Sequence, residues 1–312
     1  MRRRGTGLSH QSQELTDHAL IKRQRRGQLD EDGASFLREA LCLSQKGDKR
    51  FPRVNPVNPK MLAFCTNERG SWELCLIADM VDAPSTVVIL SDRGTDNLHP
   101  SWSPDGRKLV FEGCRRSRSC DEPAIFVVRR SGGGLRQLAK QGDAPVWSPT
   151  GAWIAYHGKQ AKSDECAGLV RVKPSGRGRR ALLPRKPDSH DACSWGGAGA
   201  DFAPDGKRLV YYGLHPGRVE EFPNPGGGTF KVQHYDPGMY TVGLDGSHRR
   251  IVRTRSLDDT EFFVIPFTWS PDGRSLLWRD ERGTYVGDAD GSSARRISRS
   301  GTQFAWQALA RR

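Results

Sequence analysis

The chain has 312 residues, of which 36% are hydrophobic and 27% charged, and it contains 35 glycines and 19 prolines. This length and composition fit one large all-β domain or two small ones. Nowhere do about 18 apolar residues run together, so no membrane span is expected. The net charge of +13 is scattered along the chain. Because no groove-reading helix or ribonucleoprotein motif accompanies it, no nucleic-acid partner is expected.

Residues 1–50 are expected to form an irregular segment, partly helical or disordered, before a folded domain at 51–312. Only Ala34–Leu41 has a helix-like pattern. Two basic clusters, at 2–4 and 22–26, have no apolar stretch between or after them. This start therefore does not predict a secretory signal.

One pattern recurs four times further along, starting at Pro100, Pro145, Ala200 and Phe267. In each copy an aromatic residue precedes a small residue, proline, Asp or Thr, and glycine, and an apolar run follows. Proline presets the first central position of a tight turn, and glycine takes the positive φ where the next strand begins. The pattern therefore predicts a hairpin corner between two short strands.

Each corner is followed by a third strand, a glycine-containing turn and a fourth strand. The third strands are expected at 124–128, 169–172, 239–242 and 284–286. Four strands in each repeated unit are typical of the blades of a β-propeller. The sequence therefore predicts an all-β propeller of four-stranded blades.

An earlier, degenerate unit brings the number of visible repeats to five. Its strands are expected at 60–64 and 72–77, and Asn55–Pro59 takes the place of the corner. Its first strand is expected to be missing. Thr302–Trp306 looks like a solitary first strand that would complete this unit and close the ring, removing exposed edges. Both five and six blades are compatible with these repeats.

The aromatic-Ser-Pro-Asp-Gly corner followed by an apolar strand resembles the repeat of the TolB-like, or WD40-like, β-propeller family. Trp102–Gly106 and Trp269–Gly273 carry the full motif, and the resemblance covers about residues 54–308. It implies the fold but no single activity, because similar repeats occur in the periplasmic Tol-Pal component, in propellers attached to prolyl-oligopeptidase-type hydrolases and in stand-alone bacterial proteins. Residues 1–50 are too short for the α/β domain that precedes the propeller in TolB, so a direct Tol-Pal role is not expected.

One face of the propeller is expected to carry the long loops. Second-to-third loops and blade crossovers share this loop-rich face, whereas the corners on the opposite face are tight. The long loops are expected at 113–122, 158–167, 185–199, 213–238 and 255–265. Because binding residues concentrate on loops, we expect the loop-rich face to be the binding surface. The alternative is that the insertions are merely tolerated.

Six side chains in these loops are candidate ligand-binding residues. They are His190, Asp191, Trp195, His215, His234 and Tyr235. Their convergence over the central channel would resemble the histidines of lyases built on propellers, and the alternative is that they are solvated loop residues. His99 lies just before a first strand, where a polar side chain more often satisfies the backbone than binds a metal.

No catalytic residue, metal site or cofactor is predicted. The chain lacks the Gly-x-Ser-x-Gly nucleophile elbow and the His-Glu-x-x-His zinc motif. Asp288–Gly291 lacks the later ligands of a calcium loop and is expected to be a turn. We therefore expect a monomeric, non-catalytic binding or scaffold propeller that recognises a protein, peptide or glycan. The alternative is a metal-assisted lyase or hydrolase acting on a saccharide.

Six of the seven cysteines fall in the propeller, and their positions suggest three disulfides. The expected pairs are Cys65–Cys75, Cys114–Cys120 and Cys166–Cys193, with Cys42 left over. Such pairing favours a periplasmic or otherwise extracytoplasmic location. Buried free thiols and a cytoplasmic location are the alternatives.

Overall fold

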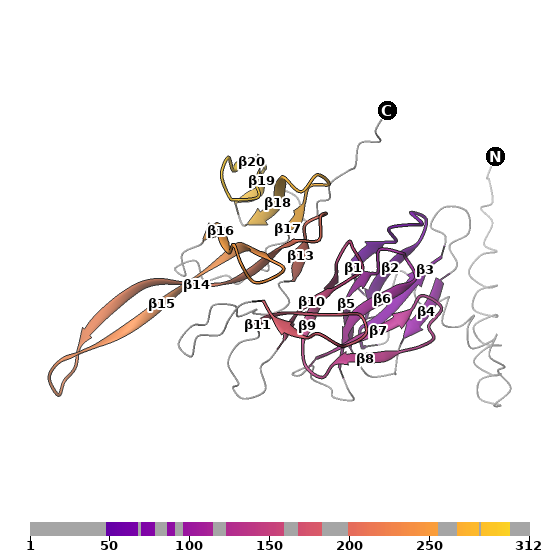
Figure 1. The fold of residues 1–312 in the computed structure, drawn as a ribbon, viewed down its shortest axis with the longest axis horizontal. Coiled ribbons are helices and arrows are strands. Elements are labelled where there is room, and N and C mark those ends of the chain that lie inside the picture. The colour runs from indigo at the N-terminus through magenta and orange to yellow at the C-terminus, as the bar shows by residue number, and fades with distance from the viewer. Residues whose placement is uncertain are drawn as a thin grey trace, which may run out of the picture.

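A computed structural model describes most of the chain after residue 47. The described residues are 48–67, 70–78, 86–90, 96–114, 123–158, 168–182, 199–254, 267–280 and 282–299. They form five four-stranded antiparallel sheets, which are the blades of a propeller (Figure 1). No helix occurs among these residues, and so none that could cross a membrane. The predicted all-β propeller is confirmed, with five blades in the described part of the chain.

Each blade takes its four strands in chain order. Blade 1 consists of β1 (Lys49–Val54), β2 (Leu62–Thr66), β3 (Glu73–Ile77) and β4 (Thr86–Leu90). Blade 2 consists of β5 (Asn97–Trp102), β6 (Lys108–Gly113), β7 (Ala124–Arg129) and β8 (Arg136–Ala139). Blade 3 consists of β9 (Asp143–Trp147), β10 (Ile154–Gly158), β11 (Gly168–Val172) and β12 (Arg180–Ala181). Blade 4 consists of β13 (Ala200–Phe202), β14 (Arg208–Pro223), β15 (Thr229–Gly243) and β16 (Arg250–Thr254). Blade 5 consists of β17 (Phe267–Trp269), β18 (Ser275–Asp280), β19 (Gly283–Asp288) and β20 (Arg295–Ser298).

Blade 1 has a first strand of its own, which corrects the expectation that this strand is missing. β1 pairs antiparallel with β2, with Val54 opposite Leu62. The strand is basic and mostly exposed, and Val54 stands where the other first strands end in an aromatic residue. Its sequence therefore lacks the signal that marks its counterparts. Thr302–Trp306 lies outside the described residues.

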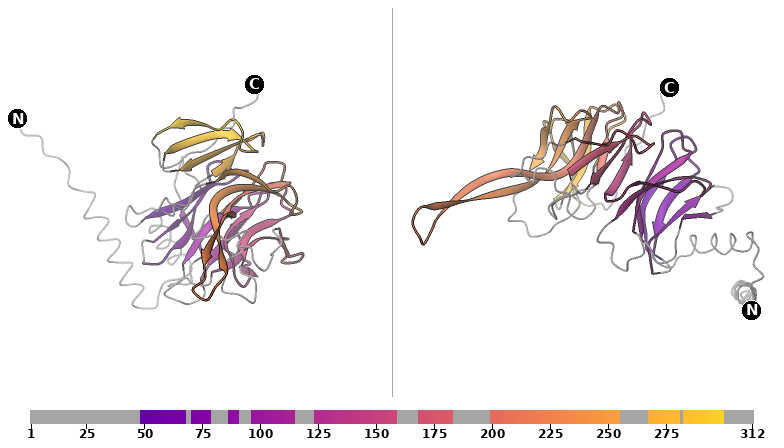
Figure 2. Two further views of the ribbon diagram at one scale, coloured as in Figure 1. Left: turned by 90° about the vertical axis from the view of Figure 1, so that its left-hand side faces the viewer. Right: turned by 60° about the horizontal axis from the view of Figure 1, so that its bottom comes forward.

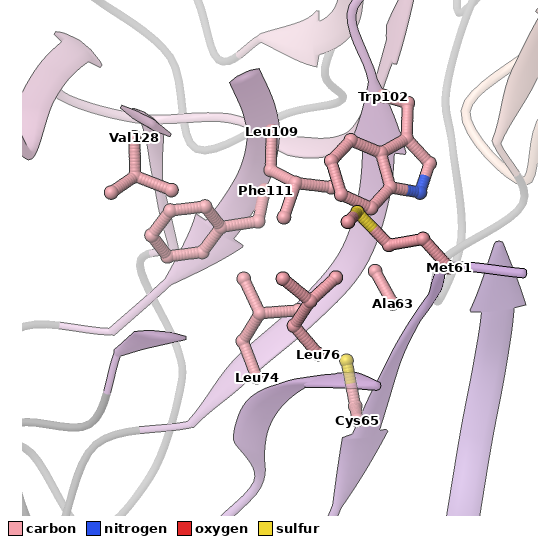
Figure 3. Packing of buried hydrophobic residues seen from close by; sticks show 9 residues of the cluster. All are labelled: Met61, Ala63, Cys65, Leu74, Leu76, Trp102, Leu109, Phe111 and Val128. Carbon is pink, nitrogen blue, oxygen red and sulfur yellow. The ribbon is translucent and has the colours of Figure 1, made fainter. Parts of the chain in front are cut away.

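Apolar side chains between successive blades form the core. Between blades 1 and 2, Leu74 and Leu76 pack in one cluster with Trp102 and Phe111 (Figure 3). Equivalent clusters join blades 2 and 3, 3 and 4, and 4 and 5. Because successive residues of a strand face opposite sides of its sheet, a blade between two neighbours buries both of its faces.

The predicted corners also connect neighbouring blades. Gly106 and Gly206 have φ values of 65° and 66°, in the left-handed region that glycine adopts without strain. A side chain at any corner glycine would meet the corner of the preceding blade. The contacts pair Gly106 with Asn55, Gly151 with Pro104, Gly206 with Thr150, and Gly273 with Pro204. Glycine therefore serves both the turn and the close approach of two blades.

Asn55 builds the degenerate corner of blade 1. Its buried side-chain oxygen accepts hydrogen bonds from the backbone N–H groups of Val57 and Asn58, at 3.0 and 2.9 Å. Its Nδ2 donates to the carbonyl of Gly106 in blade 2, at 2.9 Å. An asparagine thus replaces the usual motif while keeping the link to the next corner.

Blade 4 extends into a projecting ribbon that was predicted to be a long loop. β14 and β15 stay paired from Gly213–Gly238 to Pro223–Thr229, and this two-stranded ribbon leaves the body of the propeller (Figures 1 and 2). We call residues 214–237 the arm. The expectation of an irregular loop at 213–238 is therefore wrong, because the segment finds its hydrogen-bond partners within itself.

Candidate functional site

The arm carries three of the six predicted site residues. His215 lies on β14, and His234 and Tyr235 lie on β15. The arm is a second-to-third connection, so it leaves the propeller from the loop-rich face with these three residues on its strands. His190, Asp191 and Trp195 lie outside the described residues. A ligand-binding role for the six residues stays a prediction.

Charged side chains on the arm form ion pairs with one another. Nε2 of His234 and Nη2 of Arg218 lie 3.0 and 2.9 Å from the two carboxylate oxygens of Glu220. Nζ of Lys231 lies 2.7 Å from Oε1 of Glu221. Exposed pairs of this kind contribute at most about 1 kcal/mol each. They do, however, neutralise much of the charge along the ribbon.

The far end of the arm exposes large apolar side chains. Val219, Phe222 and Phe230 are 52%, 39% and 49% exposed, and we call these three residues the arm tip. Phe222 and Phe230 face each other across the ribbon with their ring centroids 5.5 Å apart. This aromatic pair supports the ribbon by about 0.2–1 kcal/mol. Much of its apolar surface is nevertheless left in water.

The first strands of the five blades carry side chains at equivalent positions. The first strands of successive blades contact one another from β1 to β17, and the ring is formed by the residue before the last one of each strand. The members of this inner ring are Arg53, Ser101, Val146, Asp201 and Thr268. Oγ of Ser101 accepts the backbone N–H of Trp147, and Oγ1 of Thr268 donates to Oδ2 of Asp201, at 3.0 and 3.2 Å. The inner ring therefore links neighbouring blades.

Asp201 and Arg53 give the inner ring its charges. Burial raises the pKa of Asp201 to about 6, although the charge of Arg53 and the hydrogen bond from Thr268 favour the ionised form. The Arg53 guanidinium is exposed, and it has no ion-pair partner within 4.0 Å among the described residues. Within the described ranges, its one side-chain hydrogen bond goes to the carbonyl of Pro52, at 3.4 Å.

A buried histidine–carboxylate pair joins β5 and β6 at the end of blade 2 nearer the loop-rich face. Nδ1 of His99 is 2.9 Å from Oε1 of Glu112, and the other carboxylate oxygen accepts the backbone N–H of Ala144 at 2.6 Å. The side chains of His99 and Glu112 are only 16% and 7% exposed. The ring of Phe51 lies 4.0 Å from that of His99. The sequence signal for Glu112 is a single acid within an apolar strand.

Three successive first strands share a strained residue at this level. Phe51, His99 and Ala144 have φ values of 56°, 51° and 45°, and each precedes a proline. A non-glycine residue in this conformation costs about 1–3 kcal/mol. The strand register also breaks at this point in each of the three blades. The first strands of blades 1 to 3 thus share the same irregularity near the loop-rich face.

Comparisons with known proteins support the propeller fold. No protein-family model matches the chain. Over 127 residues it is 29% identical to the Tol-Pal system protein TolB of Anaeromyxobacter dehalogenans strain 2CP-C and 28% identical to that of Anaeromyxobacter sp. strain K. Each match covers 40% of this chain and 28% of the relative, so it spans less than a third of these relatives. TolB from Acinetobacter baumannii has a TM-score of 0.55 at 17% identity, over 80% of this chain and 54% of that one.

The fold is that of a TolB-like propeller. The oligogalacturonate lyase of Vibrio parahaemolyticus has a similar fold, with a TM-score of 0.57 at 14% identity over 86% of this chain and 69% of that one. At these identities the solved structures show the fold alone. The resemblance to the TolB-like repeat that the corners predict is confirmed.

One predicted disulfide of the TolB-like propeller is wrong. Cys65 is a free, fully buried thiol, and burial raises its pKa far above the usual range. Cys65 lies opposite Leu74, whereas Cys75 lies opposite Phe64. The two cysteines are thus one residue out of register and point to opposite faces of blade 1, so they cannot bond. Cysteines 42, 120, 166 and 193 lie outside the described residues.

The described ranges of the TolB-like propeller contain no group of three or more His, Cys, Asp or Glu side chains placed to hold a metal ion. The arm and the inner ring, with His99 and Glu112 beside it, are therefore the two candidate sites that can be built from described side chains.

Proposed function

We propose that this protein is a non-catalytic binding or scaffold propeller that docks a partner protein through its arm, on the loop-rich face. The exposed apolar arm tip is the observation that carries the proposal. Burying a large apolar side chain contributes about 1.5–3 kcal/mol, so covering the exposed halves of Val219, Phe222 and Phe230 would contribute about 3 kcal/mol. That is more than a hundredfold in affinity.

The architecture of the arm supports a docking role. An isolated two-stranded ribbon is only marginally stable in water, because it has no neighbour on either face. A partner that covers one face would stabilise the ribbon and bury the aromatic pair in the same step. The relatives named for the Tol-Pal system support a protein as the partner. A peptide or glycan as the partner, and a monomeric state, are further parts of the proposal.

We also propose an extracytoplasmic location. The similarity to Tol-Pal system proteins supports it. Disulfides at Cys75 and Cys114, which are typical of oxidising compartments, are part of this proposal. Mass spectrometry of the purified, unreduced protein, with and without prior reduction, tests this point. Unmodified thiols at both positions before reduction would contradict the disulfides.

Removing the arm tests the docking proposal. Gly213 and Gly238 are opposite each other, so an Asn-Gly turn between them would replace residues 214–237 while keeping the β14–β15 pairing. We expect this variant to keep the melting temperature of the propeller and to lose the partner in co-purification from the native host. The double variant Phe222→Ser/Phe230→Ser is expected to lose most of the binding. Its matched control is Glu221→Gln/Lys231→Gln, which removes an exposed pair from the same ribbon.

Unchanged partner recovery with the arm removed and the propeller folded would contradict the proposal. The alternative of a metal-assisted lyase or hydrolase acting on a saccharide depends on the loop histidines His190, His215 and His234, so it stays a prediction from the sequence. Stoichiometric metal in the purified protein, lost on replacing His190, would favour it.

A further inference from the structure

Blade 3 departs from the other blades at one position of its third strand. In blades 2 to 5 the fourth strand carries an arginine at the same place in the pairing: Arg136, Arg180, Arg250 and Arg295. The residue opposite this arginine is Val127, Thr241 or Val286 in blades 2, 4 and 5, but it is Arg171 in blade 3. Side chains directly opposite each other share a face of the sheet, with their Cβ atoms about 4.5–5.5 Å apart. Like charges in this arrangement destabilise the pairing, so folding alone does not favour the second arginine.

Arg136 shows what the fourth-strand arginine does in blade 2. Its guanidinium donates to the carbonyls of Pro174 and Ser175 in the next blade, to the latter at 3.2 Å. It therefore joins blades 2 and 3. Arg171 makes no such link among the described residues, where it has no ion-pair partner within 4.0 Å and its buried Nε has no hydrogen-bond partner. Its charge is thus uncompensated at a position where blades 2 and 5 have valine.

Four side chains of blade 3 gather around this pair, and we call Trp153, Arg171, Lys173 and Arg180 the basic cluster. Cζ of Arg171 lies 4.1 Å from the ring centroid of Trp153, and Nζ of Lys173 lies 5.8 Å from the same centroid. Trp153 packs against the apolar core between blades 3 and 4, so the cluster lies on the face of blade 3 toward blade 4. Trp153 and Arg171 are half-buried, whereas Lys173 and Arg180 are exposed. The cluster is therefore open to solvent.

The acidic neighbour of the basic cluster is Asp245 of blade 4. Burial and the charge of Arg180 lower the pKa of Arg171, and the charge of Asp245 acts in the opposite direction. No ion pair within 4.0 Å joins Asp245 to the cluster in the part of the chain that the structure describes. The backbone N–H and the hydroxyl of Ser247 donate to Oδ1 of Asp245 instead, at 2.9 and 2.6 Å. Three cationic side chains thus face one carboxylate, which leaves two excess positive charges.

We propose that the basic cluster binds the phosphate group of a small phosphomonoester. Such a group carries about −1.5 to −2 charges at pH 7, which matches the excess positive charge, whereas a carboxylate carries only one. The guanidinium forks of Arg171 and Arg180 come from neighbouring strands and can donate to different oxygens of one phosphate. The half-buried Trp153 provides an apolar contact for the esterified group. The arm leaves from the loop-rich face and contributes no residue to the cluster, so this site goes beyond docking of a partner protein.

Calorimetric titration of the full chain with phenyl phosphate, inorganic phosphate and acetate tests the proposal. The titrations are made in about 0.15 M NaCl, which screens binding to scattered surface charges. We expect phenyl phosphate to bind most tightly, since its ring can contact Trp153. Inorganic phosphate should bind more weakly, and acetate at least about tenfold more weakly than inorganic phosphate.

Arg171→Val separates binding from folding, because it gives blade 3 the residue that blades 2 and 5 have at this position. We expect it to keep or raise the melting temperature, since it removes a repulsion, and to weaken phenyl phosphate binding at least about tenfold. Arg180→Gln should weaken binding by a similar factor. Arg250→Gln is the matched control, because this equivalent arginine of blade 4 lies opposite Thr241, and it should leave binding unchanged. Removal of the arm should also leave it unchanged, which separates this proposal from the docking role.

Four results would overturn the proposal. The first is no heat of binding with phenyl phosphate at about 10 mM. The second is tighter binding of inorganic phosphate than of phenyl phosphate, which would make the ligand the free ion. The third is acetate binding as tight as that of phosphate, or an equal loss in Arg250→Gln, which would make the cluster an unselective basic surface. The fourth is unchanged binding in a folded Arg171→Val variant.

Discussion

The blades and the arm are both built from paired antiparallel strands, yet the blades bury their aromatic residues and the arm exposes them. Tyr211 and Tyr240 stack across β14 and β15 inside blade 4 and are completely buried. Further along the same two strands, Phe222 and Phe230 stack in the same manner and remain largely exposed. The pairing is equivalent, but only the first pair has a neighbouring blade against its face. Burial is therefore set by what packs against the ribbon, and the exposed pair indicates a surface suited to a partner.

Truncating a buried and an exposed side chain of blade 4 should give the largest difference in the free energy of unfolding. Leu209→Ala removes a fully buried side chain between blades 3 and 4 and should lower the free energy of unfolding by about 3 kcal/mol. Phe222→Ala at the arm tip should lower it by less than about 1 kcal/mol. Urea denaturation followed by tryptophan fluorescence measures both. Equal losses would mean that the arm belongs to the cooperative core.

Two glycines of blade 4 should also differ in how much their replacement by alanine lowers the free energy of unfolding. The glycine inside the propeller should show the larger loss. Gly206→Ala forces a side chain into the left-handed region and against Thr150 of the preceding corner, so we expect a loss of about 2–3 kcal/mol. Gly226→Ala, in the turn of the arm, meets no closer atom than one at 3.9 Å, so we expect a change within about 0.5 kcal/mol. Melting temperatures of the two variants test the contrast. A neutral Gly206→Ala would disprove the close contact between corners.

A pH series at Asp201 tests the burial of a charge inside the blades. Burial raises the pKa of Asp201 from 3.8 to about 6, so the folded protein holds this proton more tightly than the unfolded chain. This contribution to stability is fully present below about pH 4 and is lost as the pH rises through about 6, by at most about 3 kcal/mol. Asp201→Asn should remove this part of the pH dependence and be relatively more stable at pH 7. Parallel pH profiles of the two proteins would contradict the shift.

The blades were predictable because each corner encodes its own turn. Proline, Asp and Gly act through local backbone preferences, and the strands beside them follow from short apolar runs. The first strand of blade 1 escaped prediction because Lys49, Arg50 and Arg53 give it a basic character. Because most of its side chains are exposed, its pairing with β2 leaves no hydrophobic signal in the sequence.

The site was less predictable, because it depends on contacts between blades. Arg53 and Asp201 are separated by more than a hundred residues, so no local sequence pattern connects them. The pairing of His99 with Glu112 likewise requires the irregular turn of β5 before Pro100. The arm was missed because the prolines and glycines of 213–238 resemble those of a loop, whereas the segment forms a paired ribbon.

The contacts between corners have a consequence for how such a ring changes in evolution. The four corner glycines accommodate three types of residue from the preceding blade: asparagine, threonine and, at two of the corners, proline. A surface that accepts several neighbours does not require the matching residue to change with it. A blade can thus be duplicated, replaced or lost as a genetic unit while the junctions on either side still fit.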